Sequence, residues 1–296
     1  MNFINKKAME IFIKFWPKIL FSEERKRIRN SLRRITVQER IEDEKSGYKI
    51  SIRPWAFIRV KDERKMLLAS LNSILPVIDR GVIAYNDCTD GSDEIIEDFC
   101  KKHKGFIPLR YPYRVEPASS EKYLTGELKE ENTLAGYYNA VLNKIPKGEW
   151  LIKIDVDQIY FPDILKHSFS LPKKKNDVVI YSRLNAVRDE FDCIKVCSYI
   201  RPGDHWLICN ENLLFVNECG RGGDGRVYAF EHLKLSGRDI PYMPECSSIH
   251  FPYEKEYRSF KGEVKALMDL EDFIKSADPA EFSEKLLSVR DVMKQI

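Results

Sequence analysis

The stretch Trp150-Leu-Ile-Lys-Ile-Asp-Val-Asp157 largely decides how this chain folds. Apart from Lys153, its first five residues are apolar, which predicts a buried strand that ends abruptly in two carboxylates. Because side chains alternate along a strand, Asp155 and Asp157 are expected on one face, where they can share a cation. Hard oxygen ligands of this kind suit Mg²⁺ or Mn²⁺. Aspartate is also common in turns, so the spacing alone leaves a purely structural role open.

Other apolar runs precede this stretch and alternate with helical patterns. Strands are predicted at 55–60, 81–85 and 106–110, and helices at 63–75, 94–102 and 134–144. This alternation predicts an α/β fold of the Rossmann-like kind, with a mostly parallel sheet flanked by helices. Ligands of such sheets gather at the carboxyl ends of the strands. Asp87 and Asp90 follow the second strand and are expected at that edge, although capping of the next helix would also explain them.

The alternating order loosens after Phe161. Residues 177–182, 193–197 and 205–209 are strand-like without long helices between them, which predicts a mixed C-terminal extension of the sheet. Residues 260–296 predict two amphipathic helices separated near Pro279. The expected organisation is an N-terminal segment (1–50), a catalytic domain (51–260, with a donor half 51–160 and an acceptor half 161–260) and C-terminal helices (261–296).

Composition narrows the class of protein. The chain has 296 residues and a formal net charge of +3, too small to indicate a nucleic-acid partner. Its seven cysteines are scattered and contain no Cys-x-x-Cys pair, which favours reduced thiols and a cytoplasmic location. No apolar run approaches the roughly 20 residues that span a bilayer, and no cleavable signal is evident.

The first 35 residues differ from the rest of the chain in their pattern of apolar and basic residues. Apolar and aromatic residues recur at near-helical spacing among lysines up to Phe21, and a run rich in arginine follows at 25–34. This pattern is typical of a helix lying on an anionic membrane surface, here the cytoplasmic face of the inner membrane. A helix packed on the catalytic core, with a solvated basic face, is the alternative.

Three motifs resemble GT-A glycosyltransferases that use a nucleotide-sugar donor. They are Arg59-Val-Lys-Asp-Glu63, Asn86-Asp-Cys-Thr-Asp-Gly-Ser92 and Ile154-Asp-Val-Asp157. A longer set of motifs, between residues 54 and 185, is similar to bacterial lipooligosaccharide β-1,4-N-acetylgalactosaminyltransferases. The resemblance implies a GT-A fold and an inverting transfer from a UDP-sugar, with GalNAc the first choice, to a glycan or glycolipid acceptor. It also implies dependence on Mn²⁺ or Mg²⁺.

The resemblance also implies roles for individual residues. Asp157 and His250 would ligate the metal, and Asp155 would join them or touch the ribose. His250, in Ser248-Ile-His-Phe-Pro252, is equally explained as a core histidine on a strand. The remaining donor contacts are expected from Arg59, Glu63, Asp87 and Asp90.

Inversion by single displacement needs one group that removes a proton from the acceptor hydroxyl. Asp204, in Pro202-Gly-Asp-His-Trp206, is the first candidate because it is expected after a turn, before a strand and beside aromatic residues. A plain β-turn residue is the alternative there. Glu231 and Asp224 are rival candidates. The Gly-rich run 219–226 is expected either to close over a substrate or to be an exposed turn.

Two other functions compete with glycosyl transfer. A sugar-nucleotide pyrophosphorylase, which is a nucleotidyltransferase, shares the fold class, but residues 59–63 lack the glycines that such enzymes carry after the first strand. A non-enzymatic protein that binds anionic surfaces through its basic N-terminus is the second alternative.

Overall fold

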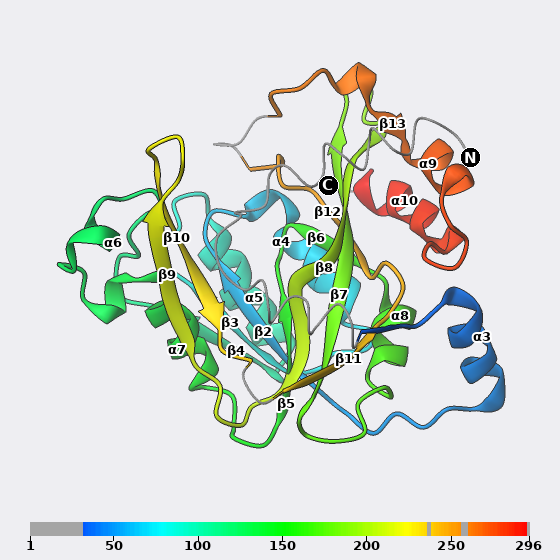
Figure 1. Ribbon diagram of the computed structural model, residues 1–296, viewed down its shortest axis with the longest axis horizontal. Helices are drawn as coiled ribbons and strands as arrows, with labels where there is room; N and C mark the ends of the chain where they lie inside the picture. Colours follow the sequence, from blue (N-terminus) through cyan, green and yellow to red (C-terminus); the bar gives the residue numbers. More distant parts are fainter. Residues whose placement is uncertain (1–31, 236–237, 256–259, 295–296) are drawn as a thin grey trace.

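The computed structural model describes residues 32–235, 238–255 and 260–294 (Figure 1). Its central element is an 11-stranded mixed sheet whose main path has the order β1-β11-β7-β8-β5-β2-β3-β4. A separate two-stranded sheet contains β9 (Phe215–Arg221) and β10 (Val227–Leu233). The α/β class predicted from the alternation of strands and helices is confirmed.

The N-terminal half of the sheet follows the predicted elements closely. The strands are β2 (Trp55–Val60), β3 (Gly81–Tyr85), β4 (Phe106–Arg110) and β5 (Trp150–Ile154). All three neighbouring pairs among them are parallel. The connecting helices are α4 (Arg64–Ile74), α5 (Ser92–Lys102), and α7 (Leu134–Leu142). The carboxyl ends of β2, β3 and β5 therefore meet at one edge of the sheet.

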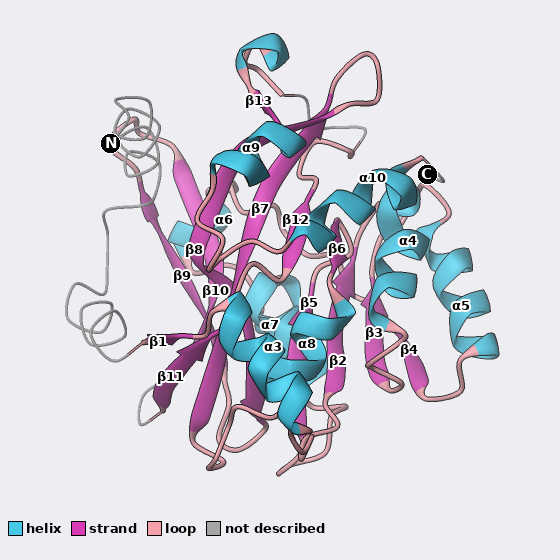
Figure 2. Cartoon of the chain, turned by 90° about the vertical axis from the view of Figure 1, so that its right-hand side faces the viewer, coloured by secondary structure: helices cyan, strands magenta, loops and turns pink. Residues whose placement is uncertain are grey.

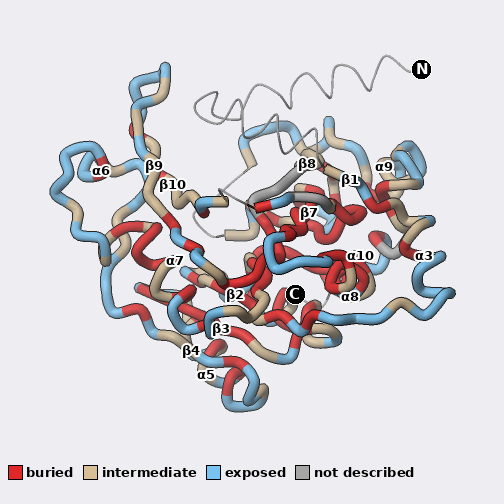
Figure 3. Tube along the Cα trace, turned by 60° about the horizontal axis from the view of Figure 1, so that its bottom comes forward, coloured by how far each residue is buried: buried red, intermediate tan, exposed pale blue. Residues whose placement is uncertain are grey.

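Helices cover both faces of this half, as the alternation of side chains requires. On one face Ile58 and Ile83 pack with Leu67 and Leu71 of α4. On the other, Phe57 and neighbouring residues pack with α7. The strands in the middle of the sheet form the most deeply buried part of the chain (Figure 3). A core of this depth fixes the strand ends that carry polar residues.

The C-terminal half extends the sheet with antiparallel pairs. β7 (Asp177–Arg188) pairs with β8 (Ile194–Cys209), and β8 also pairs with β5. The two strands predicted at 193–197 and 205–209 are thus one long strand. The prediction that Asp204 follows a turn and precedes a strand is wrong. Pairing with β7 passes from Ile200 to His205, so an irregular stretch inside β8 accommodates Pro202-Gly203 without reversing the chain.

Shorter elements complete the sheet. β6 (Gln158–Tyr160) pairs with β12 (Ser248–His250), and β12 also lies parallel to β7. β1 (Arg33–Arg34) and β11 (Asp239–Met243) form one edge, and β13 (Met268–Asp269) pairs with β8. β12 brings residue 250 beside the strand end of β5, which is far away in sequence.

The remaining helices lie around this sheet. α3 (Val37–Ser46) packs on α8 (Pro162–Ser168), and Figure 2 shows the two side by side. Asp43 Oδ2 lies 2.8 Å from His167 Nε2, and Arg40 Nε donates to Glu245 Oε1 at 2.7 Å. α6 is Lys122–Thr125, and the C-terminal region contains α9 (Leu270–Ser276) and α10 (Val289–Met293). The 3-10 helices are Glu130–Asn132, Val264–Ala266 and Glu284–Ser288.

The predicted membrane-surface segment lies almost entirely outside the described residues, which begin at Leu32. Within the described part of the chain, no helix has the length and apolar character needed to cross a bilayer.

Candidate active site

The two carboxylates after β5 point to different partners. β5 ends at Ile154, so Asp155 and Asp157 lie in the turn before β6 and do not continue the strand alternation as predicted. Asp155 Oδ2 lies 3.2 Å from Lys153 Nζ and 3.1 Å from His205 Nε2. Asp157 Oδ2 lies 3.2 Å from His250 Nε2. The turn therefore makes two neighbouring polar centres.

The first centre is Asp157 with His250. Asp157 is only 6% exposed, and its Oδ1 atom has no hydrogen-bond partner among the described residues. His250 Nδ1 lies 2.9 Å from Asn185 Oδ1, which can only accept, so Nδ1 carries the proton. Nε2 faces Asp157 Oδ2, so it can donate to that carboxylate when it carries a proton and can offer a lone pair to a cation when it does not. Burial raises the pKa of Asp157, but His250 and Lys255 outweigh burial and hold that pKa below its ordinary value.

The residues of this centre fit a divalent cation. A buried carboxylate oxygen without a donor is costly unless a cation or proton satisfies it. His250 has the arrangement of a metal-ligating histidine, because its second nitrogen is fixed by Asn185. Among the described residues, no three His, Cys, Asp or Glu side chains gather around one point. Asp157 and His250 would thus hold only part of a coordination sphere and leave positions for substrate or water oxygens.

Lys255 lies on the opposite side of Asp157. Its Nζ atom is 3.3 Å from Asp157 Oδ2 and forms an ion pair with Glu63, which precedes α4. Burial and the charge of Asp157 raise the pKa of Glu63, and Lys255 opposes this effect. A cavity of about 390 Å³ opens here, lined by residues 62–66 with Asp90, Glu254 and Lys255. An ammonium group between two carboxylates at the wall of a cavity is well placed to meet an anionic ligand.

The second centre, around Asp155, contains residues that sequence analysis missed. His205 is 3% exposed, and its Nδ1 lies 2.9 Å from Arg183 Nη1. His205 Nε2 lies between Asp155 Oδ2, at 3.1 Å, and Gln158 Nε2 of β6, at 2.8 Å. Lys153 is also buried, at 4% exposure. The sequence contained a signal for the pair of Lys153 and Asp155. Lys153 is a lysine inside an otherwise apolar strand, two positions before the aspartate.

The two aspartates predicted to hold the nucleoside differ in their surroundings. Asp90 accepts from the backbone N–H groups of Arg64 and Ser92 at 2.8 and 2.9 Å, which favours a role in joining two loops. Asp87 is exposed and has a left-handed backbone (φ 45°). Asn86, next to it, is 2% exposed, and neither its Oδ1 nor its Nδ2 has a hydrogen-bond partner. The end of β3 thus presents unused polar groups beside the edge of the sheet.

Arg59 connects this edge with β10. Its guanidinium lies 5.0 Å from the ring centroid of Tyr138 and 5.6 Å from that of Tyr137. Burial lowers the pKa of Arg59, but Tyr138 and Glu231 raise it by more, so the guanidinium stays charged. Glu231, one of the predicted bases, lies on β10, which packs on α7, the helix that carries Tyr137 and Tyr138.

The other predicted bases are placed differently. Asp224 is exposed in the turn between β9 and β10, where its Oδ1 accepts from the Arg226 backbone N–H at 3.1 Å. Arg221, at the base of the same Gly-rich turn, pairs with Glu121 at 2.7 Å. The turn is thus tied to the segment that precedes α6. For Asp204 the structure fixes only its place within β8.

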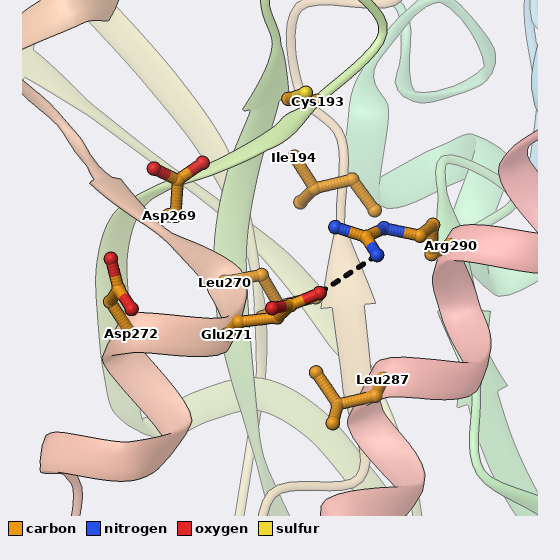
Figure 4. A pocket seen from close by; sticks show the side chains of 8 residues that line it. All are labelled: Cys193, Ile194, Asp269, Leu270, Glu271, Asp272, Leu287 and Arg290. Atoms are coloured by element: carbon orange, nitrogen blue, oxygen red, sulfur yellow. Dashed lines mark ion pairs between the residues drawn. The ribbon is translucent and has the colours of Figure 1, made fainter.

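A smaller cavity, of about 180 Å³, lies between the start of β8 and the C-terminal helices (Figure 4). Glu271 of α9 points across it to Arg290 of α10, and their ion pair measures 2.7 Å. Asp269, on its wall, is paired with Lys195 at 2.8 Å. These two ion pairs link the two C-terminal helices and join the segment before α9 to β8. They account for three of the charged side chains that line the cavity, so the cavity gives no indication of a ligand.

Ligands of an α/β sheet gather at the carboxyl ends of its parallel strands, where this chain has acidic residues and a histidine, and the family comparison shows that it is a glycosyltransferase. It belongs to the Beta-1,4-N-acetylgalactosaminyltransferase (CgtA) family, whose model matches residues 4–289. The predicted resemblance and enzyme class are confirmed, and the non-enzymatic alternative is set aside. A comparison with curated proteins finds no match.

Solved structures share part of the fold. One is the mannosyltransferase PcManGT from Pyrobaculum calidifontis with GDP-Man and Mn²⁺ (14% identity, TM-score 0.34). Another is glucosyl-3-phosphoglycerate synthase from Mycobacterium tuberculosis with Mn²⁺, UDP and phosphoglyceric acid (16% identity, TM-score 0.28). These matches cover 49% and 53% of this chain, and 41% and 49% of those proteins. The inositol-1-phosphate CTP transferase from T. maritima is a third match, with 9% identity and a TM-score of 0.39. This match covers 84% of this chain and 98% of that protein.

Proposed function

We propose that this glycosyltransferase moves a sugar from a UDP-sugar, with GalNAc the first choice, to a bacterial lipooligosaccharide or related surface glycan. The transfer would invert the anomeric configuration and depend on Mn²⁺ or Mg²⁺. The observation that carries the proposal is the buried Asp157 Oδ1 atom, which has no partner among the described residues, beside Nε2 of His250. The family membership supports the choice of donor sugar and acceptor.

The roles of the site residues follow from their chemistry. Asp157 and His250 would hold the metal, whose positive charge stabilises the departing diphosphate. Lys255 would orient the diphosphate from the other side of Asp157, since a lysine can exchange carboxylate partners for phosphate oxygens. Asp155, fixed by Lys153 and His205, would contact the ribose or a metal-bound water.

The nucleoside would lie between the ends of β2 and β3. Asp87 and the unpartnered amide of Asn86 are the proposed contacts to the base or ribose. Arg59, Glu63 and Asp90 would shape the same region, Asp90 through its hydrogen bonds to the loop backbone.

One carboxylate must remove the proton of the acceptor hydroxyl. Among the candidates Asp204, Asp224 and Glu231, we favour Glu231, because it lies on β10, which packs on α7 and thus on the helix whose tyrosine rings meet Arg59. Asp224 is the weakest candidate, since its carboxylate already accepts a hydrogen bond from the backbone of its own turn.

The proposed location is the cytoplasmic face of the inner membrane, held there by the basic segment 1–35. Flotation with anionic liposomes, with and without these residues, tests this part of the proposal. Equal flotation of both forms would contradict it.

The transfer itself is tested by UDP release from UDP-GalNAc, UDP-GlcNAc and UDP-Gal with Mn²⁺. We expect release with at least one donor, abolished by EDTA and by Asp157→Asn. Asp98→Asn is the matched control, because Asp98 is an exposed aspartate on α5. Failure of the wild-type protein to bind any of these donors in the presence of Mn²⁺ would refute the proposal.

A further inference from the structure

The segment that follows β12 is fixed beside Asp157 at both ends. The Phe251 N–H donates to the Asp157 carbonyl oxygen at 2.8 Å. Lys255 Nζ lies 3.3 Å from Asp157 Oδ2. Because each residue spans at most about 3.6 Å, the α-carbon of Tyr253 lies within roughly 7 Å of that of Phe251. Tyr253 is therefore a neighbour of the proposed metal site.

Glu254 holds the same segment from the side. Its carboxylate accepts from Arg188 Nε and Nη2 at 2.8 and 2.9 Å, and it also pairs with Lys65 of α4. Two parallel hydrogen bonds to one guanidinium fix orientation as well as position. The backbone on either side of Tyr253 is consequently held before any ligand binds.

The Tyr253 ring itself is open to solvent. Its side chain is 38% exposed, and its hydroxyl makes no hydrogen bond with any described residue. The ring meets Phe260 edge-on, with centroids 5.2 Å apart and planes at 73°. A Cβ on Gly262 would lie 2.8 Å from the Phe260 ring, so that ring rests directly against the backbone there. Phe260 therefore packs against Tyr253 with the two ring planes at a steep angle.

We propose that the Tyr253 ring is a stacking platform for a pyranose ring of the acceptor glycan. The inference rests on the proposed function and adds an acceptor subsite to it. The face of an aromatic ring is electronegative and attracts the C–H groups that line one face of a pyranose. A sugar placed there would present its hydroxyl groups to the Asp157 edge, where the donor is proposed to bind.

The surroundings favour a sugar over a protein partner. A single exposed ring is far smaller than a specific protein interface, which buries about 800 Å² on each partner. Tyr253 is followed directly by Glu254 and Lys255, and ordered charged groups of this kind can hydrogen-bond hydroxyl groups. An aromatic ring beside such groups suits a ligand that has both an apolar face and many hydroxyls.

The test is saturation-transfer NMR with methyl β-D-galactopyranoside and methyl β-D-glucopyranoside on the full chain. We expect wild-type protein and Tyr253→Phe to bind at least one glycoside, and Tyr253→Ala to bind it about tenfold more weakly. Tyr113→Ala is the matched control, because Tyr113 is 45% exposed and meets Tyr111 edge-on at 5.4 Å. Tyr113 follows β4, the outermost strand of that side of the sheet, and its loss should leave glycoside binding unchanged.

UDP affinity, measured on the same proteins with Mn²⁺, separates this inference from the proposed function. Tyr253→Ala should bind UDP as the wild type does; a loss of UDP affinity would mean that the ring stacks on the nucleotide and would overturn the inference. Equal glycoside binding by wild type and Tyr253→Ala, or no binding of either glycoside by wild type, would also overturn it. Failure of the proposed function would appear instead as wild-type protein that binds no UDP-sugar.

Discussion

His250 Nε2 lies 3.2 Å from Asp157 Oδ2, while Nδ1 of the same ring lies 2.9 Å from Asn185 Oδ1. Asn185 is itself oriented, because its Nδ2 donates to Ser198 Oγ at 2.8 Å. The chain from Ser198 to Asp157 thus fixes both the tautomer and the direction of the imidazole. Asn185 is a positioning residue for the proposed metal site, and its removal should weaken metal binding without removing a ligand.

Asn185→Ala should lower the affinity for Mn²⁺ about 10- to 100-fold, as is usual when the hydrogen-bond partner of a ligating histidine is lost. Asn185→Asp keeps an oxygen that accepts from Nδ1 and should stay close to wild type. Titration followed by the electron paramagnetic resonance of free Mn²⁺ measures both variants. Equal affinities of wild type and Asn185→Ala would show that His250 needs no such orientation or does not ligate.

Metal binding should also be visible in thermal stability. At a Mn²⁺ concentration 100 times the Kd, the folded state gains about 2.7 kcal/mol, which should raise the Tm by several degrees. Asp157→Asn should abolish the rise, and EDTA should reverse it in the wild type. Asp98→Asn should keep it. A full Tm rise in Asp157→Asn would place the cation elsewhere.

The donor half of the fold could be predicted because its strands and helices are local patterns. β2, β3 and β5 are largely apolar runs in which Arg59 and Lys153 are the charged residues, and the acidic residues after them could be assigned to one edge without further information. The Asp155 centre could not be predicted, because His205 reaches Asp155 only through the antiparallel pairing of β5 with β8. The Pro-Gly pair at 202–203 predicts a turn, whereas β8 continues through it with an irregularity in its pairing with β7.

Lys255 offers a test of donor binding that does not involve the metal ligands. Lys255→Gln should weaken UDP binding about 10- to 150-fold, because a charge-assisted hydrogen bond to the diphosphate is worth roughly 1.5–3 kcal/mol. Isothermal titration with UDP and Mn²⁺ measures the change. Lys265→Gln, at a lysine whose side chain is 88% exposed, should have no effect. An unchanged Kd in Lys255→Gln would leave the ammonium with a structural role only.

Glu254 should make stability depend on pH. Burial raises its pKa, but hydrogen bonds from Arg188 and Lys65 outweigh burial and hold the pKa below its ordinary value. The stabilisation is therefore present above the unfolded-state pKa, near 4.3, and is lost as the pH falls through the lower folded-state value. Glu254→Gln should cost about 1–3 kcal/mol at pH 7, and the difference from wild type should shrink as the pH falls from 5 toward 3.

Urea unfolding at several pH values measures this difference. Glu190→Gln is the control, since its side chain is 63% exposed and its ion pair with Lys265 is loose at 3.5 Å. An exposed pair of this kind contributes little, so the control should stay near wild type at every pH. A Glu254→Gln deficit that persists undiminished at pH 3 would assign the loss to packing rather than to charge.

Gly105, before β4, should tolerate no side chain. A Cβ there would lie 1.9 Å from the Asp79 carbonyl oxygen, a backbone atom that the sheet holds in place. Gly105→Ala should therefore cost about 1–3 kcal/mol of unfolding free energy. Gly223→Ala, where a Cβ would meet nothing within 4 Å, should change stability little. Equal stabilities of the two variants would mean that the loop shifts freely.

The pairing of β12 with β6 and β7 determines when, during synthesis and folding, His250 can reach Asp157. Ser248 and Gln158, hydrogen-bonded across this junction, are 90 positions apart in the chain, and His250 and Asn185 are 65 apart. Contacts of such long sequence separation form late, because the intervening chain must first be ordered. During synthesis the parallel strands β2 to β5 can assemble while His250 is still inside the ribosome. A growing chain can therefore form the parallel half of its sheet well before His250 reaches Asp157 and completes the proposed metal site.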